Sequence, residues 1–293
     1  MTDWLISNDR SGQARKVEEL RAQLAAVGLE VEHVDPELPV TNFAPGKGER
    51  VIIAGGDGTV RRYAAHVARH DAVLTVLPAG TGNDFARGLR IPLDIESACR
   101  VAAHGVVRTL DMALLDEKTF LNVAHIGFGT EVSRHVDAEQ KRGWGRFAYV
   151  RTLFGRLRQS RGFKASIEHP GGRVRGRWLQ ISIANGNSFG GGQQFFGADP
   201  FDGQLDLLAI RPRSLLMLIL LWLRAKIRRS PPPSEALLKL RGERFTVTGN
   251  RRLTVRADGE HLGNLPASFA VQPSALQVLV DADFHTKSGN MVG

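Results

Sequence analysis

The sequence has a single cysteine, Cys99, which excludes a disulfide within the chain. Its first residues, MTDWLISNDRSG, lack the basic and then apolar pattern of a secretion signal. The longest uncharged apolar run, 215–223, is far shorter than the roughly 20 residues that a helix needs to cross a bilayer. We therefore expect a protein of the reducing cytoplasm that does not span a membrane.

The 293 residues exceed a typical domain of about 100–200 residues, and 42% of them are hydrophobic. We expect two domains, each with its own core. The first, 1–112, alternates apolar strand patterns with helical patterns, which is typical of a doubly wound α/β sheet. The second, 113–275, has short strand patterns separated by turn residues and predicts an antiparallel β-sandwich. The end of the chain, 276–293, can return to the first domain.

The formal net charge is +9, and the positive charge is uneven, because twelve Lys and Arg fall within 134–177. Such a surface favours anionic lipid headgroups or nucleic acid as a neighbour, although a solvated basic face explains most individual residues. The segment from Leu215 to Arg229 is apolar, then basic, and ends before three prolines. It either packs against the sandwich or lies at a membrane interface. Oligomeric state stays open, a homodimer included.

Two glycine-rich loops follow neighbouring strand patterns of the first domain. Gly55-Gly56-Asp57-Gly58-Thr59 comes directly after RVIIA and precedes a helical pattern, and PAGTGNDFAR follows VLTVL. Glycines at a strand's carboxyl end let backbone N–H groups approach phosphates, and the N-terminus of a helix favours negative charge. The two loops together predict a nucleotide site.

The order GGDGT and then PAGTGNDFAR resembles the diacylglycerol kinase catalytic domain family, which includes sphingosine kinases and bacterial lipid kinases. The likeness continues through SNDRSG, LDMALLDEKTFLNVAHIGFG, ANGNSFGGG, ADPFDGQLD and ADGE, so that it covers most of the chain. It implies a nucleotide-binding α/β domain shared with NAD kinases, a β-sandwich, and transfer of the γ-phosphoryl group of ATP to a lipid alcohol.

The resemblance also implies roles for particular residues. Asp258 of the DGE motif would be the general base, and Asp57 would act near the phosphates and their Mg²⁺. A structural Mg²⁺ would be bound by the carboxylate of Asp202 and by backbone oxygens of Asp199 and Gln204. The residues expected at the nucleotide are Asn8, Ser11, Gly12, Gly55, Gly56, Asp57, Gly58, Thr59, Val60, Thr81, Asn83, Asp84 and Glu260.

Two departures from the family pattern leave alternatives open. Gln13 stands where several relatives have lysine, and Arg61-Arg62 stand where most have Asn-Glu. Two cations in the first turns of a helix oppose its dipole at about 0.3–1 kcal/mol each. Diacylglycerol or a related lipid is the expected acceptor. The alternatives are a soluble acceptor, as in NAD kinase, and a non-catalytic nucleotide-binding regulator, and nucleic-acid binding ranks last.

Overall fold

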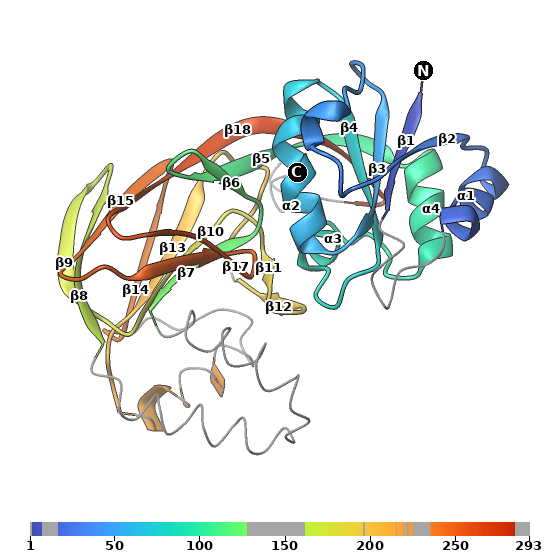
Figure 1. Cartoon of the computed structure of the whole chain (residues 1–293). Coiled ribbons are helices and arrows are strands. Elements are labelled where there is room, and N and C mark those ends of the chain that lie inside the picture. The colour runs from blue at the N-terminus through green and yellow to red at the C-terminus, as the bar shows by residue number, and fades with distance from the viewer. Residues whose placement is uncertain are drawn as a thin grey trace, which may run out of the picture.

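The computed structural model describes residues 2–7, 17–127, 162–195, 197–214, 216–218, 220, 223–224 and 235–284. Figure 1 shows an α/β domain beside a β-sandwich. The predicted fold class, a doubly wound α/β domain followed by an antiparallel sandwich, is confirmed. Asn8, Ser11 and Gly12 lie outside the described residues.

The α/β domain is built on four parallel strands in the order β2-β1-β3-β4. The strands are β1 (Asp3–Ser7), β2 (Val31–Val34), β3 (Arg50–Gly55) and β4 (Val73–Pro78). The helices are α1 (Val17–Ala26), α2 (Asp57–Arg69), α3 (Asp84–Gly88) and α4 (Ile95–His104), and η1 (Val40–Asn42) is a 3-10 turn. Strands β3 and β4 are buried along most of their length, as expected of a parallel sheet covered on both faces.

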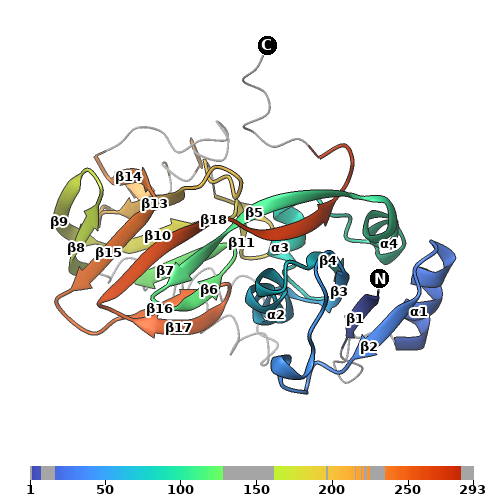
Figure 2. The ribbon, with the colours of Figure 1, turned by 90° about the horizontal axis from the view of Figure 1, so that it is seen from above.

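Two long strands join this domain to the sandwich. β5 (Val106–Leu115) and β18 (Ala267–Val280) pair antiparallel along both domains, as Figures 1 and 2 show. Near its end β18 pairs parallel with β4, and near its start it pairs with β15. Its register with β5 shifts between Gln272 and Leu276, so an irregularity sits where the strands pass from one domain to the other.

Through β5 and β18, strands of both domains form one ten-stranded sheet. In the sandwich, the outer part of this sheet packs against a six-stranded antiparallel sheet. The first layer contains β6 (Lys118–Phe120), β8 (Phe163–His169), β9 (Gly172–Trp178) and β15 (Arg244–Gly249). The second contains β7 (Val123–Gly127), β10 (Gln180–Ala184), β13 (Leu205–Ile210), β14 (Leu237–Gly242), β16 (Thr254–Ala257) and β17 (Glu260–Asn264). A small hairpin, β11 (Ser188–Phe189) and β12 (Gln193–Gln194), lies beside α3.

The core of the sandwich is apolar and close-packed, because alternate residues of both sheets face inward. Its largest fully buried side chains include Trp178, Phe120, Phe245 and Phe269. Within the part of the chain that is described, no helix has both the length and the apolar character that a bilayer span requires.

Candidate active site

The two glycine loops touch at the carboxyl edge of the parallel sheet. They follow β3 and β4, which are paired neighbours, so both open on the same edge. A Cβ atom added to Gly80 would lie 2.5 Å from the Cα atom of Gly56, closer than any real contact allows. Glycine is therefore required here for the close approach of two backbones.

Asn83 holds the second loop in shape. Its side-chain oxygen accepts a hydrogen bond from the Gly80 N–H at 2.9 Å, and its side-chain nitrogen donates to the Gly80 carbonyl at 2.7 Å. The residue is buried and has a φ of 50°, a left-handed conformation that asparagine tolerates. Thr81 lies exposed on the same loop, whereas Val60 is buried in the core beneath the first loop.

Asp57 begins α2 and reaches across to the second loop. Its Oδ1 atom accepts a hydrogen bond from the Phe85 N–H at 2.8 Å, and its Oδ2 atom lies 3.0 Å from the position that a Cβ on Gly82 would occupy. Burial raises the pKa of Asp57, and the negative charge of Asp84 adds to that shift. The first glycine loop thus presents a partly desolvated carboxylate where phosphates are expected.

Asp84, which the sequence placed near the phosphates, points toward the second domain. Its Oδ1 atom accepts hydrogen bonds from the Ser188 hydroxyl at 3.0 Å and from the Gly191 and Gly192 N–H groups at 3.1 and 2.8 Å. Gly191 and Gly192 have φ angles of 82° and 103°, which favour glycine. Asp84 therefore connects α3 of the first domain to the β11–β12 hairpin of the second.

Asp258 lies in the turn between β16 and β17. Asp258 and Gly259 have φ angles of 48° and 83°, as in the tight hairpin turns that Asp-Gly favours. The carboxylate accepts three backbone hydrogen bonds, from Leu121 at 2.7 Å, Asn122 at 2.9 Å and Val123 at 3.2 Å. These donors fix the carboxylate at the start of β7, where the sandwich meets the α/β domain.

The environment of Asp258 suits a proton acceptor near neutral pH. Although the residue keeps some exposed surface, its carboxylate is enclosed, and this burial raises its pKa to about 6. The three backbone N–H groups favour the ionised form, whereas the charge of Asp57 favours the protonated form. The charge of Asp57, which comes from the other domain, is the last of these effects, and burial is the largest.

An ion pair links the two domains beside these carboxylates. The Arg61 guanidinium of α2 contacts the Glu260 carboxylate of β17, and Glu260 Oε1 lies 3.1 Å from the position of a Cβ on Gly58. Arg62 donates instead to the Leu38 carbonyl at 3.1 Å. The two arginines that depart from the family pattern thus have partners, and Arg61 keeps a cation beside the acidic groups of the site.

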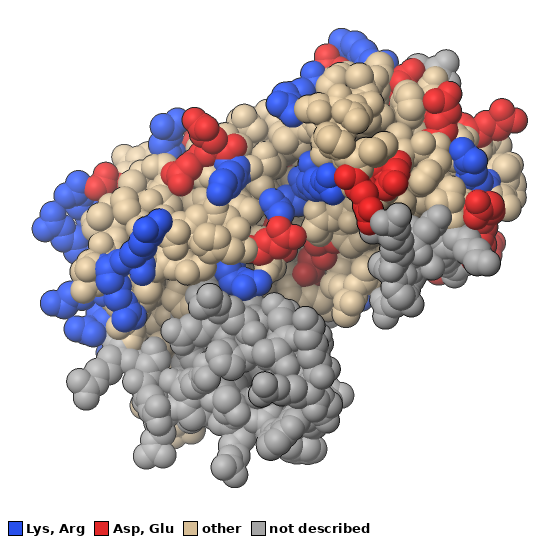
Figure 3. All heavy atoms as spheres, viewed as in Figure 1, with Lys and Arg blue, Asp and Glu red and all other residues tan. Residues whose placement is uncertain are grey.

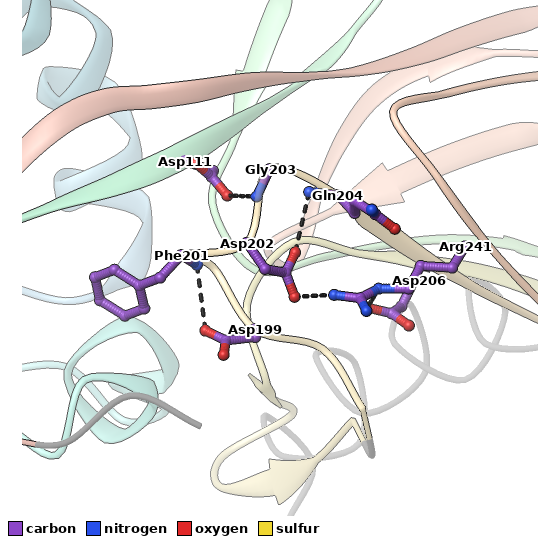
Figure 4. A network of polar contacts seen from close by, with 8 residues as sticks. All are labelled: Asp111, Asp199, Phe201, Asp202, Gly203, Gln204, Asp206 and Arg241. Atoms are coloured by element: carbon purple, nitrogen blue, oxygen red, sulfur yellow. Dashed lines mark hydrogen bonds and ion pairs between the residues drawn. The ribbon is translucent and has the colours of Figure 1, made fainter. Parts of the chain in front are cut away.

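Asp199, Asp202 and Gln204 lie in the turn before β13, and both carboxylate oxygens of Asp202 already have partners (Figure 4). Asp202 Oδ1 accepts from the Gln204 N–H at 3.0 Å, while Asp202 Oδ2 pairs with the Arg241 guanidinium. Asp199 Oδ1 accepts from the Phe201 N–H at 3.2 Å. Among the described residues no group of three or more His, Cys, Asp or Glu side chains could hold a metal ion. The arrangement does not fit the predicted Mg²⁺.

Burial raises the pKa of Asp202 to about 6, although the Arg241 charge works in the opposite direction. The carboxylates of Asp199 and Asp206 add to the rise. The Asp202 carboxylate thus lies beside two other carboxylates and the Arg241 guanidinium.

Two further side chains, Asp111 and Asn185, hold the junction between the domains. Asp111 of β5 accepts from the Ser274 N–H at 2.8 Å and from the Gly203 N–H at 2.7 Å. Asn185 donates to the carbonyls of Asp111 at 2.9 Å and Leu121 at 3.0 Å. Asp111 lies in the LDM motif, but its partners are backbone N–H groups, which leave no signature in a sequence.

The fold and site define a two-domain nucleotide-binding protein of the kinase type. The family model of the diacylglycerol kinase catalytic domain matches residues 3–115, and that of the YegS C-terminal NAD kinase β-sandwich-like domain matches residues 122–280. A relative in Cronobacter sakazakii, named "Probable lipid kinase YegS-like", is 31% identical over 83% of this chain and 82% of its own. The relative of that name in Pseudomonas syringae pv. tomato is 32% identical over 83% and 80%.

The crystal structure of a diacylglycerol kinase from Bacillus anthracis str. Sterne has the same fold, with a TM-score of 0.74 over 97% of this chain and 98% of that one. Its sequence identity is 19%, so this likeness concerns the fold alone. The family models and the relatives together show that the chain belongs to the YegS-like lipid kinases of the diacylglycerol kinase family. The resemblance drawn from the motifs is confirmed. Membership of this family implies a phosphotransferase that uses ATP.

Proposed function

We propose that the protein transfers the γ-phosphoryl group of ATP to a hydroxyl of diacylglycerol or a related lipid. The observation that carries this proposal is that the first glycine loop meets the turn that holds Asp258. Asp57 lies in that glycine loop, Asp258 is fixed in the sandwich, and Glu260, two residues after Asp258, contacts Arg61 of α2 and lies 3.1 Å from the position of a Cβ on Gly58. A phosphoryl donor and an acceptor can therefore meet between them.

Asp258 is the general base in this proposal. With a pKa of about 6 its carboxylate is ionised at neutral pH and still basic enough to accept the proton of a lipid hydroxyl. The three backbone N–H groups hold it in one orientation, which a phosphoryl transfer needs more than covalent chemistry. Asp57 and Glu260 would lie near the phosphates of ATP and the Mg²⁺ that accompanies them, with Arg61 supplying a positive charge.

A lipid acceptor agrees with the surface of the sandwich. Leu216, Met217, Leu220 and Leu223 are exposed, with Leu216 at 67% and Leu220 at 48%. Figure 3 shows Lys and Arg gathered over the end of the sandwich at β8 and β9. Exposed apolar side chains and a basic surface each suit contact with an anionic membrane. We propose peripheral membrane contact through this region by a cytoplasmic protein.

The test measures transfer of label from γ-labelled ATP, with Mg²⁺, into micellar lipids. The panel contains diacylglycerol, monoacylglycerol, phosphatidylglycerol, ceramide and sphingosine, with NAD as a soluble acceptor. Label in one glycerolipid supports the proposal. Label in NAD would move the function to a soluble acceptor, and ATP binding without any labelled product would favour a nucleotide-binding regulator.

A further inference from the structure

Three aspartates lie in and directly after the turn that opens β13. Asp199 and Asp202 are in the turn, Asp206 is the second residue of the strand, and all three are at most one-fifth exposed by residue or side chain. Three carboxylates held so close and so shielded from water need a positive charge among them. We call residues 199–206 the acidic loop.

Arg241 provides that charge from the neighbouring strand. It lies on β14 directly opposite Asp206 of β13 in the register of the two strands. Its Nη2 atom contacts Asp202 Oδ2, and its Nε atom lies 3.9 Å from Asp206 Oδ2 (Figure 4). A guanidinium has several N–H donors in one plane, so one side chain can reach two carboxylates at once.

Two further carboxylate oxygens of the loop accept from backbone N–H groups, Asp202 Oδ1 from Gln204 and Asp199 Oδ1 from Phe201. We propose that the Arg241 guanidinium takes the place of a divalent cation in the acidic loop. The loop is therefore stabilised by the protein's own cation and does not require Mg²⁺ to keep its shape.

The acidic loop also contacts the two strands that cross between the domains. Gly203 N donates to Asp111 Oδ2 at 2.7 Å, and Asp111 N donates to the Pro200 carbonyl at 2.7 Å. Asp111 also accepts from Ser274 N, at the irregularity where β18 passes between the domains. Arg241 thus stabilises the loop that connects to both crossing strands, so the junction of the domains keeps its shape without a metal.

The test is thermal unfolding of the purified full chain without nucleotide or lipid, in EDTA and in MgCl₂ or CaCl₂ at about 10 mM. We expect the parent Tm to agree within about 1 °C among these conditions. Arg241→Ala should lower the Tm in EDTA by about 2–4 °C, and either cation should restore part of the loss, because the carboxylates lose their guanidinium. Adding Asp202→Asn to Arg241→Ala should abolish that restoration.

Arg173→Ala is the matched control, since Arg173 is also half-exposed and pairs with a single carboxylate, that of Glu168. It should gain no response to either cation. Arg241→Lys keeps a charge and should unfold near the parent without a cation response, which covers the case in which the alanine variant does not fold. The proposal is overturned if MgCl₂ raises the Tm of the parent and this rise is lost in Asp202→Asn. It is also overturned by an Arg241→Ala variant that matches the parent in both Tm and cation response.

Discussion

Replacing Asp84 with alanine should weaken the connection between the two domains. The change removes the acceptor of three donors, the Ser188 hydroxyl and the N–H groups of Gly191 and Gly192. Hydrogen bonds to a charged group contribute about 1.5–3 kcal/mol each, but the glycine turn is exposed and water replaces part of the loss. We expect the free energy of unfolding to fall by about 2–4 kcal/mol.

Asp84→Asn should lose less, about 1–2 kcal/mol, because an amide oxygen at the Oδ1 position still accepts from the Ser188 hydroxyl and the Gly192 N–H. The Gly191 N–H, which also donates to Oδ2 at 3.0 Å, would there face an amide NH₂ group that cannot accept. Asp94→Ala is the matched control. It removes one helix cap, the bond from Ser97 N at 2.8 Å, and should cost about 1 kcal/mol without touching the second domain.

The assay combines denaturant unfolding with hydrogen exchange at the Gly191 and Gly192 amides. In Asp84→Ala both amides should exchange faster than in the parent, whereas in Asp94→Ala they should not change. An Asp84→Ala variant of parental stability that has lost its affinity for ATP would refute this reasoning. In that case the carboxylate serves the nucleotide, as the family resemblance implies.

Three further predictions concern the site. The kcat/KM of phosphoryl transfer should fall about tenfold per pH unit below a pH of about 6 and level off above it, because Asp258 must be ionised to accept a proton. A kcat/KM that does not change down to pH 5 would exclude Asp258 as the base. Arg61→Ala should raise the KM for ATP about tenfold, and unchanged affinity in calorimetry would remove Arg61 from the phosphate site. Gly80→Ala should lower the free energy of unfolding by about 2 kcal/mol or more, because its Cβ would overlap Gly56. A variant with the same free energy of unfolding as the parent would contradict the close approach of the loops.

Parts of the site could be predicted because they depend on short stretches of sequence. Glycine loops after two apolar strands must open on one edge if the strands are parallel neighbours, and β3 and β4 are. The Asp258-Gly259 turn is similarly local. The family resemblance added the link between these separate motifs, which spacing alone does not give.

Other parts depend on contacts between distant residues and left no local signal. The partners of Asp84 lie more than a hundred residues away, and Arg241 reaches the acidic loop only because β14 pairs with β13 in one register. β5 and β18 continue through both domains, so the domains share a sheet that a composition change near residue 112 does not reveal. The contact of Asp202 with Arg241, a cation from a neighbouring strand, likewise left no signal in the sequence.

The central claim is that Asp258 accepts the proton of a lipid hydroxyl while the α/β domain holds ATP. The most direct measurement is transfer of label from γ-labelled ATP to diacylglycerol by the parent and by Asp258→Asn, with ATP affinity measured on both. We expect labelled lipid from the parent, a loss of at least about a hundredfold in the variant, and nearly equal affinity for ATP. A variant that labels the lipid as fast as the parent would contradict it.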